Sequence, residues 1–124
     1  IYKKYNQNVK LNNSQKNLLE KLKKEGLSGL EERTIKSFPN GIKDIKVLSA
    51  LKLAVYLEEG IYYHTDVYNK VKNLILKGAK SKDIITIAFV KEKTGLSRKY
   101  VIPLLNVLER EKLLKRQGND RIVI

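Results

Sequence analysis

The chain has 124 residues, 42% of them hydrophobic, and its 26 lysines and arginines outnumber its 13 aspartates and glutamates. This composition allows one compact domain or two small ones and argues against wholesale disorder. Because there is no cysteine, disulfides and thiolate metal sites are excluded. No stretch approaches the roughly 20 apolar residues of a membrane helix, so we expect a soluble cytoplasmic protein. There is no methionine either, which predicts that the chain comes from a longer polypeptide.

The charge is unevenly distributed along the sequence. Residues 1–68 contain 12 basic and 8 acidic side chains, a net of +4, whereas residues 69–124 contain 14 basic and 5 acidic ones, a net of +9. A field of this size attracts polyanions, either nucleic acid or an anionic membrane surface. An A/T-rich genome also produces lysine-rich chains, but it does not explain why the shorter half carries most of the excess.

The first elements in the chain are two predicted helices. After a polar lead-in over residues 1–13, the apolar periodicity predicts a helix with Ser14 as its N-cap and Gly26 as its end. Ser28–Glu31 has the spacing of a capping box, which predicts a short second helix through Lys36.

A third helix and a β-hairpin complete the first half. Residues 38–41, FPNG, are typical of a turn, and residues 42–52 carry apolar side chains at helical spacing. Residues 53–64 then change to short runs rich in tyrosine and valine around a tight turn, which predicts two strands. Three helices followed by a hairpin is the element order of a winged helix, here predicted over residues 1–65.

The same order repeats in the second half, residues 66–124. Thr65 and Asp66 cap a helix that Gly78 ends. A brief strand-like segment precedes a second helix ending at Gly95, a third helix starts at Ser97, and a hairpin closes the chain. On the first of these helices, one face collects the apolar residues Val67, Val71, Leu74 and Ile75. The sequence therefore predicts a mainly α fold with small β-hairpins, built as tandem winged-helix domains.

The start of the last helix is the strongest candidate for nucleic-acid binding. In helix-turn-helix proteins the second helix of the motif is presented to nucleic acid, and here it begins with Arg98, Lys99 and Tyr100 after the cap Ser97. A helix N-terminus already offers backbone N–H groups to phosphate. Cations are unfavourable at this end of the helix dipole, which favours a functional reason over an ordinary solvated turn. Lys91, on the preceding helix, lies close enough to contribute.

The terminal hairpin is the second candidate surface. Lys115 and Arg116 lie on one strand and Arg121 on the other, around a turn predicted at Gln117–Asp120. Wings with basic strands contact a nucleic-acid backbone, but a charged hairpin tip is also typical of any solvated edge strand. The sequence leaves these two interpretations open.

Four tyrosines gather around the first hairpin. They are either stacking platforms for unpaired bases or, as we favour, packing residues of the domain. They are Tyr56, Tyr62, Tyr63 and Tyr68.

The sequence offers little for catalysis. His64 is the only histidine, and it has no suitably spaced partner for a triad or a metal cluster. No Gly-rich phosphate-binding loop is present either. We therefore expect a binding module that is not an enzyme and uses no metal or cofactor.

Three motifs in the second half occur together and in order: SRKY at 97–100, IPLL at 102–105 and the basic wing. The stretch TGLSRKYVIPLLNVLEREKLLKRQGNDRIVI, about a quarter of the chain, resembles the last winged helix of the bacterial selenocysteine-specific elongation factor (SelB) family. Residues 61–71, IYYHTDVYNKV, resemble the segment that connects one winged helix to the next in that family. The first winged helix matches the family only loosely. Asn106 stands where the family often has an acidic residue, and Gln117 where a hydrophobic one is usual.

The resemblance implies that the partner is RNA. In that family the final domains bind an mRNA hairpin, the selenocysteine insertion (SECIS) element, while other domains bind GTP and selenocysteyl-tRNA. It implies a monomer that reaches the ribosome only through its parent protein, with residues 66–124 as the principal RNA binder. Carried over to this sequence, it implies an RNA face that contains Arg98, Lys99, Tyr100, Arg116 and Arg121, to which we add Ser97, Lys91 and Gln117.

Two rival functions remain open at this point. A winged-helix transcription regulator would insert its helix into the DNA major groove and usually form a two-fold dimer, although no dimerisation helix is evident. A protein-interaction module would bind nucleic acid weakly and expose an apolar patch.

Overall fold

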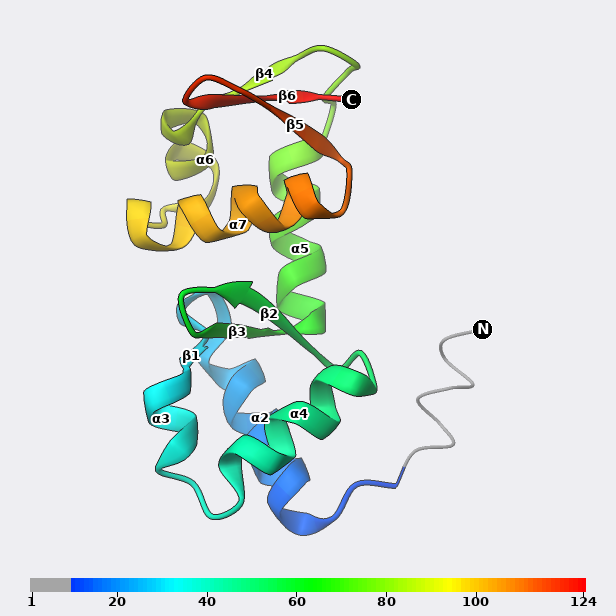
Figure 1. Cartoon of the computed structure of the whole chain (residues 1–124), viewed down its shortest axis with the longest axis vertical. Coiled ribbons are helices and arrows are strands. Elements are labelled where there is room, and N and C mark those ends of the chain that lie inside the picture. Colours follow the sequence, from blue (N-terminus) through cyan, green and yellow to red (C-terminus); the bar gives the residue numbers. More distant parts are fainter. Residues whose placement is uncertain (1–9) are drawn as a thin grey trace. The chain divides into compact units, whose positions relative to one another are not determined.

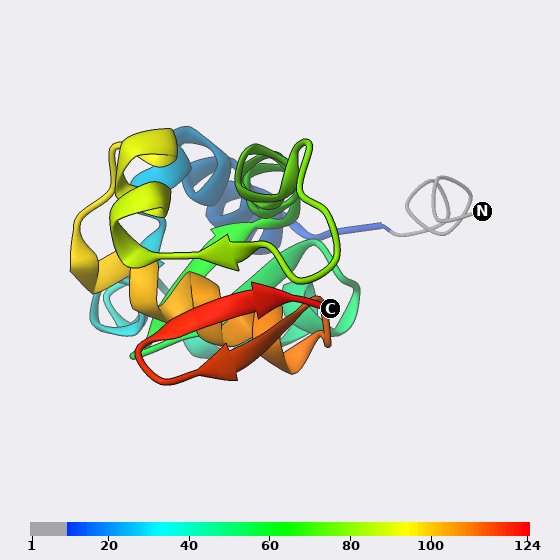
Figure 2. The same ribbon diagram turned by 90° about the horizontal axis from the view of Figure 1, so that it is seen from above.

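The computed structural model describes residues 10–124, so most of the predicted lead-in lies outside the described residues. The chain forms two compact units (Figures 1 and 2). Among the described residues, the first comprises residues 10–56 and Gly60–Val67, and the second comprises Leu57–Glu59 and Tyr68–Ile124.

The first unit has helices packed against a small three-stranded sheet. Its strands are arranged in the order β1-β3-β2, with β1 antiparallel to β3. Along the chain the elements are α2 (Asn13–Glu25), a 3₁₀ turn (Gly26–Ser28), β1 (Leu30–Glu31), α3 (Glu32–Lys36), α4 (Gly41–Ala50), β2 (Ala54–Glu58) and β3 (Ile61–His64).

Two local predictions for this unit were wrong. The N-cap of α2 is Asn12, not Ser14, because Asn12 Oδ1 accepts from the Gln15 backbone N–H at 2.8 Å while Gln15 Oε1 accepts from Asn12 N–H at 3.0 Å. This reciprocal pair is a capping box. The predicted box at Ser28–Glu31 does not form, because Leu30 and Glu31 pair with β3 as the strand β1. The helix α3 therefore begins only at Glu32, although it ends at Lys36 as predicted.

The core of the first unit follows the predicted apolar faces. α2 buries Leu18 and Leu22, and Leu19 packs against the core while partly exposed. One hydrophobic cluster of buried residues contains Leu18, Leu22, Leu30, Ile35, Ile45, Leu48 and Ala54. Helical spacing on α2 and α4 therefore accounts for Leu18, Leu22, Ile45 and Leu48 of this cluster.

The second unit repeats the order of the first. Its sheet has the order β4-β6-β5, the same pattern of first, third and second strand. One face of this sheet is covered by α7 (Figures 1 and 2). Along the chain the elements are α5 (Thr65–Leu76), β4 (Ile84–Ile85), α6 (Ile87–Thr94), α7 (Arg98–Arg110), β5 (Leu114–Gln117) and β6 (Asp120–Val123). The predicted winged-helix fold is confirmed in both halves.

The core of the second unit is built mainly from α5 and α7. On α5 the structure buries Tyr68, Val71 and Ile75, whereas Leu74 is 39% exposed, so its predicted place on the buried face was wrong. A helix advances by 100° per residue, which turns Leu74 away from the stripe that Tyr68, Val71 and Ile75 share. α7 remains a continuous helix with Pro103 inside it, and it buries Val101, Leu104, Leu105 and Leu108.

Candidate nucleic-acid interface

The first turn of α7 presents basic side chains at the N-terminus of a helix. Ser97 occupies the N-cap position with extended backbone angles, but its side chain makes no capping hydrogen bond. Its carbonyl accepts from the N–H groups of Tyr100 and Val101, both at 3.0 Å. Arg98 and Lys99 are exposed, and Lys99 Nζ lies 5.7 Å from the centre of the Tyr100 ring. The turn therefore joins two cations, a half-buried aromatic ring and a positive helix end.

The wing is a tight hairpin. Gln117 pairs with Asp120 and Arg116 with Arg121 across the two strands. The loop is therefore two residues long, Gly118–Asn119, and it lies at the centre of the turn predicted at Gln117–Asp120. Gly118 has φ +62°, a left-handed conformation that glycine adopts at little cost, as two-residue hairpin turns require.

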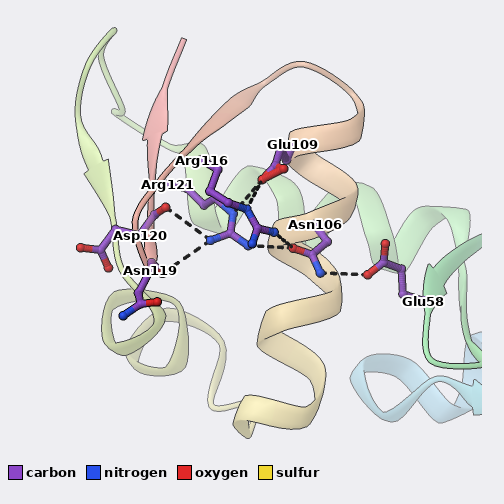
Figure 3. Close-up of polar contacts among 7 residues, drawn as sticks. All are labelled: Glu58, Asn106, Glu109, Arg116, Asn119, Asp120 and Arg121. Atoms are coloured by element: carbon purple, nitrogen blue, oxygen red, sulfur yellow. Dashed lines mark hydrogen bonds and ion pairs between the residues drawn. The ribbon is translucent and has the colours of Figure 1, made fainter.

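Two arginines of the wing converge on the side of α7 (Figure 3). Asn106 Oδ1 accepts from Arg121 Nη2 at 2.7 Å and from Arg116 Nη2 at 3.0 Å. One turn further along the helix, Glu109 Oε1 lies 3.2 Å from Arg116 Nε and 3.1 Å from Arg121 Nε. The second of these contacts has the distance of an ion pair but not the alignment of a hydrogen bond. We call these four residues the wing clamp.

The two arginines of the wing clamp differ in exposure. Arg121 is 5% exposed, and its Nη1 also donates to the backbone carbonyls of Asn119 and Asp120 at 3.5 and 3.3 Å. The side chain of Arg116, in contrast, is 56% exposed. Arg121 is thus a buried part of the hairpin, and Arg116 faces solvent.

A shallow cleft of about 190 Å³ lies between α7 and the wing. Its walls combine cations, amides and two aliphatic side chains, a mixture that suits phosphate, ribose and base edges. The lining residues are Ile87, Arg98, Ile102, Asn106, Arg116, Gly118, Asn119 and Arg121.

The structure brings together only some of the predicted site residues. Arg98, Arg116 and Arg121 line the cleft, although the burial of Arg121 removes it from the outer surface. Ser97, Lys99 and Tyr100 belong to the adjoining first turn of α7, outside the lining. Lys91 and Gln117 are exposed, on α6 and β5, and do not line the cleft either.

Sequence reasoning missed the residues that hold the wing in place. Asn106 drew notice only as a departure from the family pattern, and Glu109 and Asn119 were not singled out. Asn106 and Glu109 are three residues apart on α7, so they share a helix face. Asn106 is the one polar residue in the apolar stretch 101–108 of α7, and Glu109 follows three residues later, so this pair was the signal that pointed to a partner.

Two of the four tyrosines around the first hairpin have structural roles. Tyr63 and Tyr68 are buried, and the Tyr63 hydroxyl donates to the Leu27 carbonyl at 2.8 Å. The Tyr68 hydroxyl donates to Glu111, and burial raises the pKa of the Glu111 carboxyl. Packing therefore accounts for these two tyrosines.

His64 is buried, and its Nδ1 accepts the Asp66 N–H at 3.0 Å. Burial lowers the His64 pKa, against the attraction of Asp66, so the neutral ring is favoured. Within residues 10–124, no group of three or more His, Asp or Glu side chains is arranged to hold a metal. No helix among these residues is long and apolar enough to cross a membrane.

The comparisons with known proteins converge on one family. A family model described as the winged helix of elongation factor SelB matches residues 79–123, the span that contains α6, α7 and the wing. The crystal structure of a bacterial selenocysteine-specific elongation factor is similar over 91% of this chain, with a TM-score of 0.73 and 28% identity. The chain spans only 18% of that protein.

A second solved structure shares the fold. The mRNA-binding domain of elongation factor SelB from E. coli, solved in complex with SECIS RNA, has a TM-score of 0.66 and 17% identity. The similarity covers 91% of this chain and 98% of that domain. At this identity, the likeness concerns the fold alone. A search of curated proteins found no significant match.

Proposed function

We propose that this chain, whose winged helix over residues 79–123 is of the SelB type, is the mRNA-binding part of a selenocysteine-specific elongation factor. It recognises a SECIS hairpin and thereby directs selenocysteine incorporation at UGA codons. Its own role is binding without catalysis. The activity on GTP would belong to other domains of the parent protein.

One observation carries this proposal. The residues that match the SelB winged helix are the same residues that build the cationic cleft between α7 and the wing. A cleft of this kind suits a folded RNA, because the paired A-form major groove is too narrow for side chains. Backbone phosphates at its rim would fix the register, and one or two unpaired bases of a loop or bulge would supply the specificity.

The residue roles follow from their positions. The side chains and backbone N–H groups of Arg98 and Lys99, directly after Ser97, would hold phosphates at the start of α7, with Tyr100 beside them to contact a ribose or a base. Arg116 would bind phosphate from the wing. These five residues are the core of the proposed RNA face.

The remaining predicted contacts have secondary roles in the proposal. Gln117 and Lys91 would contribute at the margins, on the wing and on α6. Arg121 would act mainly by holding the wing in shape, since it is buried. We assign the RNA contact chiefly to residues 66–124, with residues 1–65 as a second winged helix that serves as spacer. The chain would act as a monomer in the cytoplasm and reach the ribosome through its parent protein.

The experiment that tests the proposal is a binding series with three ligands. They are the hairpin downstream of a UGA codon in a selenoprotein mRNA of the same genome, a loop-scrambled version of it, and a DNA duplex. Each is titrated from 50 to 300 mM salt, on the order of the range in which phosphate contacts respond strongly. We expect the native hairpin to bind more tightly than the scrambled one by about 1–3 kcal/mol per base that is read.

Two results would contradict the proposal. If all three ligands bound equally and their affinities fell together as salt increased, the chain would bind polyanions only through its nonspecific positive charge. Preference for the DNA duplex would instead support the transcription-regulator alternative.

A further inference from the structure

The wing clamp contains more positive than negative charge. Two guanidinium groups, from Arg116 and Arg121, share one carboxylate oxygen of Glu109 and one amide oxygen of Asn106. The four side chains together carry a formal net charge of +1. Had residue 106 been an acid, the same geometry would give two cations and two anions. The wing clamp would then carry no net charge, and Arg98 would be the only uncompensated cation among the residues that line the cleft.

The orientation of the Asn106 amide is fixed from its other end. Its Nδ2 donates to Glu58 Oε1 at 2.9 Å, so its oxygen must face the arginines (Figure 3). An amide can donate on one side and accept on the other, which a carboxylate cannot do. Asn106 therefore holds two cations in place without neutralising them.

We propose that Asn106 is a positioning residue that sets both the shape and the charge of the RNA-binding wing. Through its amide oxygen it fixes Arg121 as a buried support and aims Arg116 into the cleft. Because it is neutral, the charge of Arg116 stays available for a phosphate. This inference rests on the proposed RNA-binding function, and it adds the residue that controls the strength and salt dependence of binding.

The test exchanges the positions of one charge and one amide. In the double variant Asn106→Asp/Glu58→Gln the protein keeps its net charge, and the new amide at position 58 can donate to the new carboxylate at position 106. That carboxylate now faces both arginines, so the wing clamp loses its net positive charge, while Arg98 keeps its own. One phosphate contact changes the slope of log K against log salt by about 0.9, which corresponds to about eightfold in affinity at 0.1 M salt. We expect this loss of hairpin affinity, with a slope shallower by about 1.

Three further measurements separate charge from stability. The double variant should melt within a few degrees of the wild type, because each hydrogen bond is replaced. The single variant Asn73→Asp, on the exposed face of α5, adds one negative charge outside the wing clamp and should change hairpin affinity less than twofold. Asn106→Ala keeps the charge but removes the acceptor, so it should weaken binding while leaving the salt slope unchanged.

The outcomes distinguish this inference from the proposed function. Each protein is also titrated with poly(U), a phosphate polymer without a hairpin. If the wild type binds the hairpin no better than poly(U), the proposed function fails, yet the double variant should still lose severalfold affinity for poly(U). If the double variant binds both ligands within twofold of the wild type, or loses affinity only in proportion to a lower melting temperature, the role of Asn106 is refuted.

Discussion

Neighbouring residues of the wing provide a direct test of which cations bind RNA. Arg116 and Lys115 are consecutive in β5, so their side chains point to opposite faces of the hairpin. Arg116 lines the cleft and belongs to the wing clamp, whereas Lys115 pairs across the strands with Ile122 and lines no part of the cleft. Replacing either with alanine removes one positive charge from the same strand. If RNA affinity depended only on the net charge of the protein, the two variants would lose the same affinity.

The expected effect of Arg116→Ala follows from one lost phosphate contact. With a change in slope of about 0.9, the affinity at 0.1 M salt should fall about eightfold, or about 1.2 kcal/mol. The cost to folding is smaller, because the ion pair with Glu109 is largely exposed and contributes about 0.2–1 kcal/mol. Lys115→Ala should change affinity less than twofold. Arg116→Lys should keep the salt slope but lose part of the loop preference, because lysine lacks the planar fork of arginine.

The assay is fluorescence anisotropy with a labelled hairpin over the salt series, with circular dichroism melts of each variant at the same salt. Equal losses for Arg116→Ala and Lys115→Ala would refute the reasoning, because they would show that net charge alone sets affinity. An unchanged slope for Arg116→Ala would refute it as well, since a phosphate contact must release counterions.

Two further predictions concern stability. A Cβ on Gly41 would lie 1.8 Å from the Ile35 carbonyl oxygen, so Gly41→Ala should destabilise the first unit by about 3 kcal/mol or more in urea unfolding. Gly78→Ala, with φ +74° and open space around it, should cost only about 1–2 kcal/mol, and similar losses for both would contradict the steric argument. Burial holds the His64 pKa below its unfolded value of about 6.5, so the unfolded chain binds more protons and stability should decline as the pH falls from 7.5 to 5.5. A His64→Gln variant should lose most of that decline in melting temperature, and an equal decline in both proteins would rule out His64 as its source.

The architecture was predictable because its signals are local and repeated. Apolar spacing, glycine stops and tyrosine-rich strands gave the element order of both winged helices, and the resemblance to the SelB family is confirmed over residues 79–123. The details that failed depend on distant partners. Residues 28–31, SGLE, have the local pattern of a helix start. Leu30 and Glu31 form β1 instead, because they pair with Tyr62 and Ile61, which are distant in the sequence.

The candidate site was predictable in part for the same reason. The basic first turn of α7 and the basic wing are legible in the sequence, and the structure brings Arg98 and Arg116 to one cleft. The burial of Arg121 could not be predicted from the sequence, because it depends on Asn106 and Glu109 lying opposite the hairpin. A cation in a sequence shows only that a charge is present. Its exposure and its partners are properties of the fold.

The positions of the lysines and arginines indicate that the two kinds of cation have different roles. Of the 26 basic residues, 21 are lysines and only 5 are arginines, yet arginines alone supply the cations of the cleft: Arg98, Arg116 and Arg121. Lysine is a strongly hydrated point charge on a flexible stem, suited to a general field that attracts RNA from a distance. The guanidinium group has a fixed planar set of donors, so it can be held by Asn106 and Glu109 and still present a defined edge to a phosphate. In the proposed function, the arginines of the cleft would orient the RNA and most lysines would only attract it, so net charge alone does not identify the binding site.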